Sequence, residues 1–222
     1  ELLFIFPLQI VIIIMVITII VKSMSFAFKQ VLENIAGAKA PGPPVTFSIF
    51  HSVFAMELMA EKSIGRGKLA KYLDVGDGVV RTIIGRLKDA GLIVTSKARC
   101  TLTAKGSSIW KKLEEFFPKR AEIEKTELTT AEQNYAFLVK DSGHKVKSGI
   151  EQRDAAIVAG AKCAVVIVSK GGHLVIESVS NSLEKEFPKA ANQILKVIQP
   201  EDNDVIIIAG ADILQKAKHA AF

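Results

Sequence analysis

The chain has 222 residues, of which 49% are hydrophobic and 23% are charged. This length fits one large or two small domains, and the composition excludes an acidic disordered chain. The modest numbers of glycines (15) and prolines (seven) exclude fibrous and low-complexity classes. We therefore expect a globular protein with a hydrophobic core.

The residue types that build metal and catalytic sites are few and scattered. The two cysteines, Cys100 and Cys163, form no CxxC or Cys/His cluster, and the four histidines lack ligand spacing. We find no nucleophile elbow, Walker loop or HExxH helix. The sequence therefore predicts no metal, no cofactor and no enzymatic activity, with both cysteines reduced.

Residues 2–21 contain no charged side chain and are long enough to cross a hydrocarbon core of about 30 Å. Interpreted as a membrane anchor, this segment is followed by Lys22 and Lys29, which leaves the remaining chain in the cytoplasm. The alternative is that residues 1–23 are a spurious upstream extension, because Met24 opens an ordinary polar sequence. Both interpretations place the rest of the protein in the cytoplasm, and a membrane is a partner only if residues 1–23 are genuine.

The positive charge is concentrated in the middle of the chain. Residues 45–120 contain fourteen Lys or Arg and seven acidic residues, whereas residues 121–222 contain twelve and fourteen. This distribution is typical of a nucleic-acid-binding module beside a near-neutral domain, although a solvated basic face would give it as well. Residues 24–44 end in GAKAPGPP, which predicts a lead-in and linker because proline and glycine interrupt regular structure.

Residues 45–118 have the pattern of a helix-turn-helix followed by a β-hairpin. Apolar positions repeat at helical spacing, and Asp77 is placed to cap the helix that ends at Gly91. Two short runs of high β-propensity then flank a basic turn, which predicts a hairpin wing. The predicted elements are helices over 46–61, 67–73 and 79–91, strands within 92–98 and 99–105, and a final helix over 102–117.

The third helix of this pattern carries the candidate DNA-reading side chains, and we expect Arg81, Thr82 and Arg86 to enter the major groove. The wing residues Lys97 and Arg99 should contact phosphate. The candidates on the recognition helix are Asp77, Arg81, Thr82, Arg86 and Lys88. Those on the preceding helix and the wing are Arg66, Lys68, Lys71, Ser96, Lys97 and Arg99.

The stretch IGRGKLAKYLDVGDGVVRTIIGRLKDAGLI, followed by LTAKG, resembles the winged-helix domains of prokaryotic transcription regulators. It is most similar to archaeal regulators and to the N-terminal domain of the central glycolytic gene regulators. The resemblance covers about residues 45–118 and implies sequence-specific binding to double-stranded DNA. The residue spacing by itself indicates only a basic helix-turn-helix with a hairpin.

Beyond a charged connector at 119–133, residues 134–222 alternate between strand and helix patterns. The order is β-α-β-β-α-β with a terminal helix, which predicts a ferredoxin-like sandwich with helices on one face of an antiparallel sheet. Strands 163–169 and 204–210 are almost purely apolar and should form the central pair. The elements are 134–140, 149–161, 163–169, 173–178, 183–198 and 204–210. The whole chain is thus expected to be α+β, a winged helix-turn-helix followed by this domain.

Gln152, Arg153 and Asp154 begin the helix at 149–161, where an anion could bind, although a solvated helix start with a local ion pair is the simpler explanation. The segment SGIEQRDAAIVAGAKCAVVIVSKGGHLVI resembles a poorly characterised domain that follows such winged helices in archaea. That resemblance implies a regulatory or assembly role without a known ligand.

These observations together predict a sequence-specific DNA-binding transcriptional regulator with a C-terminal sensing or dimerisation domain. We expect a homodimer with double-stranded DNA as its partner and a small-molecule effector as a candidate ligand. The alternative is a winged helix that binds another protein, or a membrane-tethered assembly protein without catalytic activity.

Overall fold

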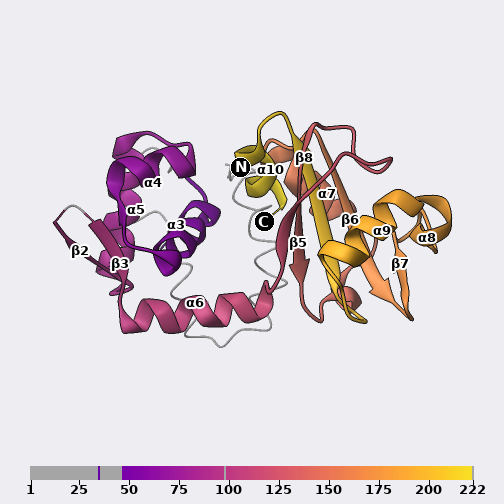
Figure 1. Ribbon diagram of the computed structural model, residues 1–222, viewed down its shortest axis with the longest axis horizontal. Helices are drawn as coiled ribbons and strands as arrows, with labels where there is room; N and C mark the ends of the chain where they lie inside the picture. Colours follow the sequence, from indigo (N-terminus) through magenta and orange to yellow (C-terminus); the bar gives the residue numbers. More distant parts are fainter. Residues whose placement is uncertain (1–34, 36–46, 98, 222) are drawn as a thin grey trace, which may run out of the picture. The chain divides into compact units, whose positions relative to one another are not determined.

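The computed structural model describes Ile35, residues 47–97 and residues 99–221 (Figure 1). The chain divides into two compact units, with the boundary between Glu114 and Glu115. The predicted hydrophobic segment 1–23 and, apart from Ile35, the predicted lead-in 24–44 lie outside the described residues. Within the described ranges, no helix is both long enough and apolar enough to cross a membrane.

The first unit contains the predicted helix-turn-helix, hairpin and final helix. Among its described residues, three strands form a small antiparallel sheet in the order β1-β3-β2, so a short strand before the second helix extends the wing. The elements are α3 (Ile49–Glu61), β1 (Ile64–Gly65), α4 (Arg66–Leu73), α5 (Asp77–Asp89), β2 (Ile93–Ser96), β3 (Arg99–Leu102) and α6 (Ala104–Phe116).

The core of this unit is built on the apolar face of α5. Val80, Ile83 and Leu87 are spaced at helical intervals and are completely buried. Side chains of the surrounding elements close around them, and this burial is the main force that holds the three-helix arrangement. The contributing core residues include Val53, Met56, Met59, Leu69, Leu73, Leu92, Ile93, Trp110 and Leu113.

α5 begins and ends two residues before the predicted range 79–91, and Gly91 follows it as the predicted terminating glycine. Gly91 has φ 71°, and the N–H of Leu92 donates to the carbonyl of Leu87 at 2.9 Å, a left-handed cap that favours glycine. The cap residue at the beginning is Gly76, so the prediction that Asp77 caps the helix is wrong. Asp77 is the first helical residue, and its carboxylate pairs with Arg66 and Arg81.

The LTAKG motif joins α6 to the end of α5. The Thr103 hydroxyl donates to the carbonyl of Gly91 at 2.8 Å and accepts from the N–H of Gly106 at 3.0 Å. Lys105 Nζ donates to the carbonyl of Ala90 at 2.8 Å, where a cation also favours the helix C-terminus. A Cβ atom on Gly106 would lie 2.0 Å from the carbonyl oxygen of Leu92, so only glycine allows this approach.

In the second unit, the described residues form a five-stranded antiparallel sheet in the order β4-β5-β8-β6-β7. The predicted α+β class, the order of elements and the adjacency of the two apolar strands, β6 and β8, are confirmed. A single 3₁₀ turn, η1 (Gly143–Lys145), follows β5. The strands and helices are β4 (Arg120–Ile123), β5 (Gln133–Val139), α7 (Ile150–Val158), β6 (Cys163–Lys170), β7 (His173–Val175), α8 (Leu183–Glu186), α9 (Pro188–Val197), β8 (Val205–Ala211) and α10 (Leu214–Ala221).

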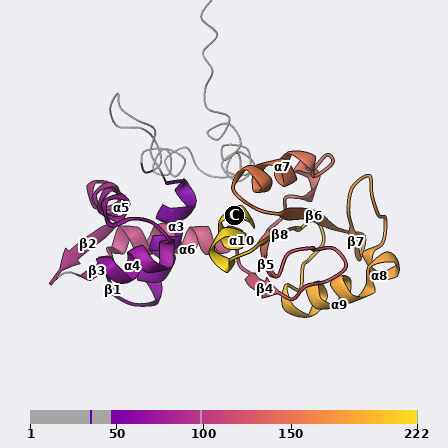
Figure 2. The same cartoon turned by 90° about the horizontal axis from the view of Figure 1, so that it is seen from above.

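The ferredoxin-like arrangement is wrong in two respects. A ferredoxin-like sheet would place the first strand of the β-α-β-β-α-β unit, β5, between the third and the fourth, whereas β8 lies here between β5 and β6. The helices also cover both faces of the sheet, with α7 and α10 on one and α8 and α9 on the other (Figure 2). The physical reason is β8, whose seven residues are all buried and therefore need a covering layer on each side.

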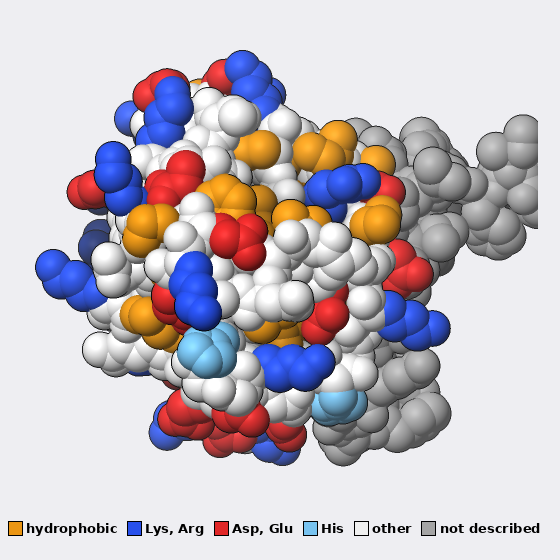
Figure 3. All heavy atoms as spheres, turned by 90° about the vertical axis from the view of Figure 1, so that its right-hand side faces the viewer, with side chains coloured by type: hydrophobic (Ala, Val, Ile, Leu, Met, Phe, Trp, Pro, Cys, Tyr) orange, Lys and Arg blue, Asp and Glu red, His pale blue; other side chains and the backbone are white. Residues whose placement is uncertain are grey.

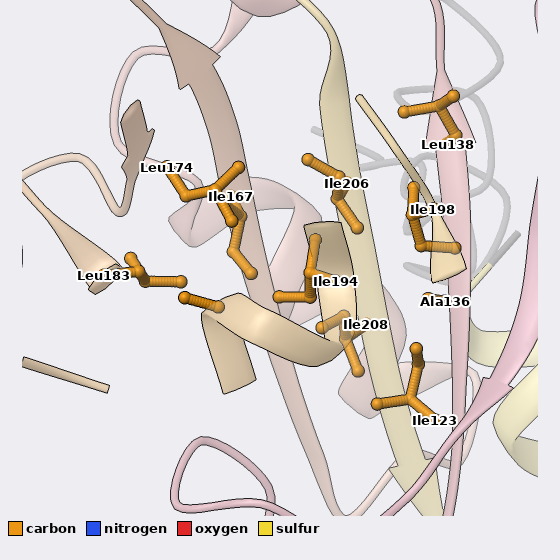
Figure 4. Packing of buried hydrophobic residues seen from close by; sticks show 11 residues of the cluster. Ile123, Ala136, Leu138, Ile167, Leu174, Leu183, Ile194, Ile198, Ile206 and Ile208 are labelled. Carbon is orange, nitrogen blue, oxygen red and sulfur yellow. The ribbon is translucent and has the colours of Figure 1, made fainter. Parts of the chain in front are cut away.

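The face toward α8 and α9 holds the main core of the unit. Ile206 and Ile208 of β8 point toward Ile194 of α9, and Leu183 of α8 closes one end (Figure 4). Because side chains alternate along a strand, Val205 and Ile207 face the opposite layer.

The predicted connector 119–133 contains a strand of this sheet. β4 pairs with β5, with Ile123 opposite Asn134, and the Ile123 side chain enters the core. The connector prediction is wrong here because a charged segment can still form an edge strand when one apolar side chain packs inward.

The predicted helix 183–198 is two helices. Pro188 lacks an N–H and disfavours helical geometry at Phe187, which has φ −135° and ψ 61°. α8 therefore ends at Glu186, and Pro188 starts α9 at the first helical position, where a missing donor costs least.

Candidate nucleic-acid interface

The outer face of α5 is basic and partly bare. Arg81, Thr82 and Lys88 are exposed on it, as predicted. Gly78 and Gly85 lie on the same face, and a Cβ on either would meet nothing within 4 Å. A binding partner can therefore approach the α5 backbone at Gly85, between the side chains of Arg81 and Lys88.

The two glycines were missed as site residues. Glycine inside an exposed helix costs about 1 kcal/mol relative to alanine, so Gly85 in the middle of α5 is unfavourable unless something needs the space. Their separation by seven positions, two helical turns, was the available signal.

Asp77 positions two arginines at the N-terminus of α5. Its carboxylate lies 3.1 Å from Arg66 Nε and 3.0 Å from Arg81 Nη2, and all three side chains are about half exposed or more. Exposed pairs of this kind contribute little to stability, so their effect is mainly to orient the guanidinium groups. The three groups together leave one net positive charge beside the helix start.

Arg86 does not face outward, and the prediction that it enters the major groove is wrong. Its exposed fraction is 7%, and its Nη1 donates to the carbonyl oxygen of Ile35 at 2.9 Å. The guanidinium lies 4.9 Å from the centre of the Phe47 ring. Arg86 therefore ties the residues before α3 to the inner side of α5.

The other predicted contact residues, on α4 and on the wing, are also exposed. Lys68 and Lys71 are exposed on α4, and Ser96 and Lys97 are exposed at the end of the wing. Arg99 is also exposed, and its Nη1 donates to the carbonyl oxygen of Ser63 at 3.2 Å, which fixes the base of the wing to the segment before β1.

Gln152, Arg153 and Asp154 do not converge on one site. Gln152 is buried on the inner side of α7. Arg153 and Asp154 lie on the outer side and pair with each other at 2.9 Å. The simpler explanation, a solvated helix start with a local ion pair, fits Arg153 and Asp154.

The acidic loop around Asp204 is a structural turn. Asp204, which is 2% exposed, accepts hydrogen bonds from the N–H groups of Asp141 and Glu201 and from Lys140 Nζ. The hydrogen bond to Glu201, aided by Asp204, raises the pKa of Lys140. Among the described residues, no group of three or more His, Cys, Asp or Glu side chains is placed to hold a metal ion.

The surface of the second unit differs in charge from the first. Figure 3 shows the side that carries β7 and α8, where basic and acidic side chains are intermixed. This agrees with the slight acidic excess of residues 121–222 and places the concentrated positive charge in the first unit.

Two family models match separate parts of the chain. Residues 47–117 match the family described as the CggR N-terminal DNA binding domain. Residues 130–222 match a domain of unknown function, DUF4443. A search of curated proteins gives no match.

Among solved structures, the chain is similar to a hypothetical protein from Pyrococcus horikoshii OT3, with 29% identity and a TM-score of 0.61 over 78% of this chain and 88% of that one. A MarR family protein from Mycobacterium tuberculosis and a ZitR mutant from Lactococcus lactis each match 40% of this chain and 66% of their own, at 20% identity and TM-scores of 0.28 and 0.29. The family matches confirm both resemblances found in the sequence, a winged helix like that of CggR followed by an uncharacterised C-terminal domain.

Proposed function

We propose that this protein is a transcriptional regulator that binds double-stranded DNA by placing α5 in the major groove. The observation that carries the proposal is the outer face of α5, where Arg81 and Lys88 flank the bare backbone at Gly85. The match of residues 47–117 to a DNA-binding domain supports it. A major groove about 12 Å wide admits one helix, and a glycine on the inserted face lets the backbone come close to the bases.

The proposed DNA-contacting residues divide into two chemical roles. Arg81 can donate two hydrogen bonds to a guanine edge, which discriminates between bases by about 1–3 kcal/mol. Lys97 and Arg99 on the wing can pair with phosphates, and such contacts release counterions without reading sequence. Specificity then resides on α5, and most of the affinity resides on the surrounding cations.

The second unit is proposed to control DNA occupancy. Residues 121–222 carry a small net negative charge, which on average repels phosphate, and their sheet has its own core. We assign to this unit the homodimer contact and a small-molecule effector site. A DNA-binding role also agrees with the cytoplasmic location predicted from residues 1–23.

Selection of bound sequences from random DNA, followed by fluorescence anisotropy at several salt concentrations, tests the proposal. Arg81→Ala should relax the preference at one base position, because the bidentate contact is lost. The double variant Lys97→Ala/Arg99→Ala should weaken all sites evenly and reduce the salt slope by about two.

Lys196→Ala, an exposed lysine on α9, is the matched control and should change neither quantity. Binding without sequence preference, or an unchanged preference in the Arg81 variant, would contradict the assignment of α5.

A further inference from the structure

The outer face of α7 carries exposed apolar side chains. Ile150 is 50% exposed, and Ile157 and Val158 are each 43% exposed. Ile213, just before α10, is 44% exposed, and α10 packs beside α7 on the same face of the sheet. A single exposed isoleucine is ordinary, but three exposed apolar side chains on one short helix, with Ile213 just before the adjacent helix, form a patch of the kind that binds another protein.

A pair of opposite charges lies in the middle of this patch. Arg153 Nε and Nη2 both donate to Oδ1 of Asp154, at 3.1 and 2.9 Å, and both side chains are about half exposed. Both bonds end on the same carboxylate oxygen, Oδ1 of Asp154. One side of α7 therefore carries, in order, Ile150, Arg153, Asp154 and Ile157, which are spaced at i, i+3, i+4 and i+7.

This order is symmetric about a point midway between Arg153 and Asp154. If a second α7 lies antiparallel against the first with a two-fold axis at that point, Ile150 lies opposite Ile157 of the other copy. In the same register, Arg153 lies opposite Asp154 of the other copy. Apolar and ionic pairing are thus satisfied together, which is the self-complementarity that an isologous dimer contact requires.

We propose that the outer face of α7 is the contact between two copies of this chain. The proposal specifies the homodimer of the proposed regulator and rests on that function for its biological role. Its test contains no DNA, so it stands or falls separately from DNA binding.

The size of the patch predicts a weak dimer. A helix of nine residues is about 14 Å long, whereas stable interfaces bury about 1,200–2,000 Å² in total. Ile213 and its surroundings extend the contact but do not make it large. We therefore expect dissociation in the micromolar range.

Charge reversal on the full chain provides a sharp test by analytical ultracentrifugation. Arg153→Asp makes the centre of the patch wholly acidic, and Asp154→Arg makes it wholly basic. Each variant alone should repel itself and dimerise at least tenfold more weakly than the unchanged chain. An equimolar mixture of the two variants should regain association, because each supplies the charge that the other lacks.

Rescue by mixing separates a contact between chains from damage within one chain, because a helix destabilised by either substitution would stay so in the mixture. Thermal unfolding of both variants checks that the fold is kept. Ile157→Lys should weaken association without rescue. A chain that is monomeric at all concentrations, or a mixture no better than its components, would overturn the proposal and favour another occupant such as residues 2–21.

Discussion

Arg86 illustrates what decides the role of a single residue on an amphipathic helix. It follows the buried Ile83 by three positions, so it lies at the margin of the apolar face. Whether a residue at this position is buried depends on residues that are distant in the sequence, which for Arg86 are Ile35 and Phe47. Arg81 and Thr82 lie farther from the apolar face, and their exposure could be predicted from spacing alone.

Replacing Arg86 should therefore reduce stability, not base recognition. Arg86→Ala removes the hydrogen bond to the buried Ile35 and the contact with the Phe47 ring. We expect the free energy of unfolding to fall by roughly 2–4 kcal/mol in urea denaturation. Lys88→Ala, on the exposed side of the same helix, should change it by no more than about 0.5 kcal/mol. Equal effects of the two substitutions would show that the guanidinium is not buried in solution.

The surroundings of Glu184 predict that it contributes to the stability of the second unit and that this contribution is lost at acid pH. Burial favours a raised pKa, but hydrogen bonds from the N–H of Leu174, its own N–H and the Ser182 hydroxyl, with the charge of His173, lower the pKa of Glu184 below its ordinary 4.5. A lowered carboxyl pKa stabilises the fold above the ordinary value, and this stability is lost as pH falls through the folded-state pKa.

Glu184→Gln should thus destabilise the protein by about 1–2 kcal/mol near pH 7, with the difference from the unchanged chain shrinking below about pH 4.5. Unfolding curves measured from pH 7 to pH 3 give this difference directly. Glu151→Gln, an exposed residue of α7, is the control. A gap that stays constant across this range would rule out the charged form as the cause.

At the scale of elements, the sequence predicted the helices and strands whose apolar side chains are regularly spaced on one face. α5 and the hairpin have clear periodicity, and Gly91 separates them, so their positions were predicted to within three residues. β4 was missed because only Ile123 in RAEI is buried, and one apolar side chain gives no alternating pattern. The break at Pro188 was missed because a proline early in a long helical pattern also fits a single helix.

The joint between α5 and α6 offers a matched comparison of two glycines. Gly106→Ala would bring a Cβ within 2.0 Å of the Leu92 carbonyl oxygen, so α6 must shift away from the wing. We expect a loss of roughly 3 kcal/mol or more, since packed backbone cannot yield cheaply. Gly85→Ala meets open space and should instead stabilise α5 by about 0.5–1 kcal/mol.

Thermal unfolding of the two variants measures both the expected loss of stability in Gly106→Ala and the expected gain in Gly85→Ala. The same Gly85 variant should bind DNA more weakly despite its greater stability, because its methyl group lies on the proposed contact face. A destabilised Gly85 variant, or a neutral Gly106 variant, would contradict the packing described here.

For the whole molecule, the fold class could be predicted but the strand order could not. The order depends on which distant strands pair, and β8, the last of these strands in the sequence, lies between β5 and β6. One signal was present: VIIIAGA has no polar residue, which indicates a strand covered on both faces. That signal conflicts with helices on a single face and would have favoured the observed layers.

The division into two units leads to a prediction about DNA binding by the whole chain. A dimer that places two recognition helices on one duplex gains affinity only when both half-sites lie on the same side of the DNA. The full chain should therefore bind a palindrome much more tightly than a fragment of residues 24–118, which keeps Ile35 for Arg86 but lacks the second unit. Inserting about 5 bp, half a helical turn, between the half-sites should remove this advantage and leave binding of the fragment unchanged.

Gel-shift titrations of the four combinations of protein and site measure the effect, with sedimentation of each protein alongside. The expected pattern is a spacing dependence confined to the full chain, because the proposed dimer contact lies in the second unit. If the fragment shows the same dependence, the winged helices themselves associate on DNA and the second unit is not the link. If neither shows it and both bind equally, the protein acts as a monomer, and control by residues 121–222 must work through something other than dimerisation.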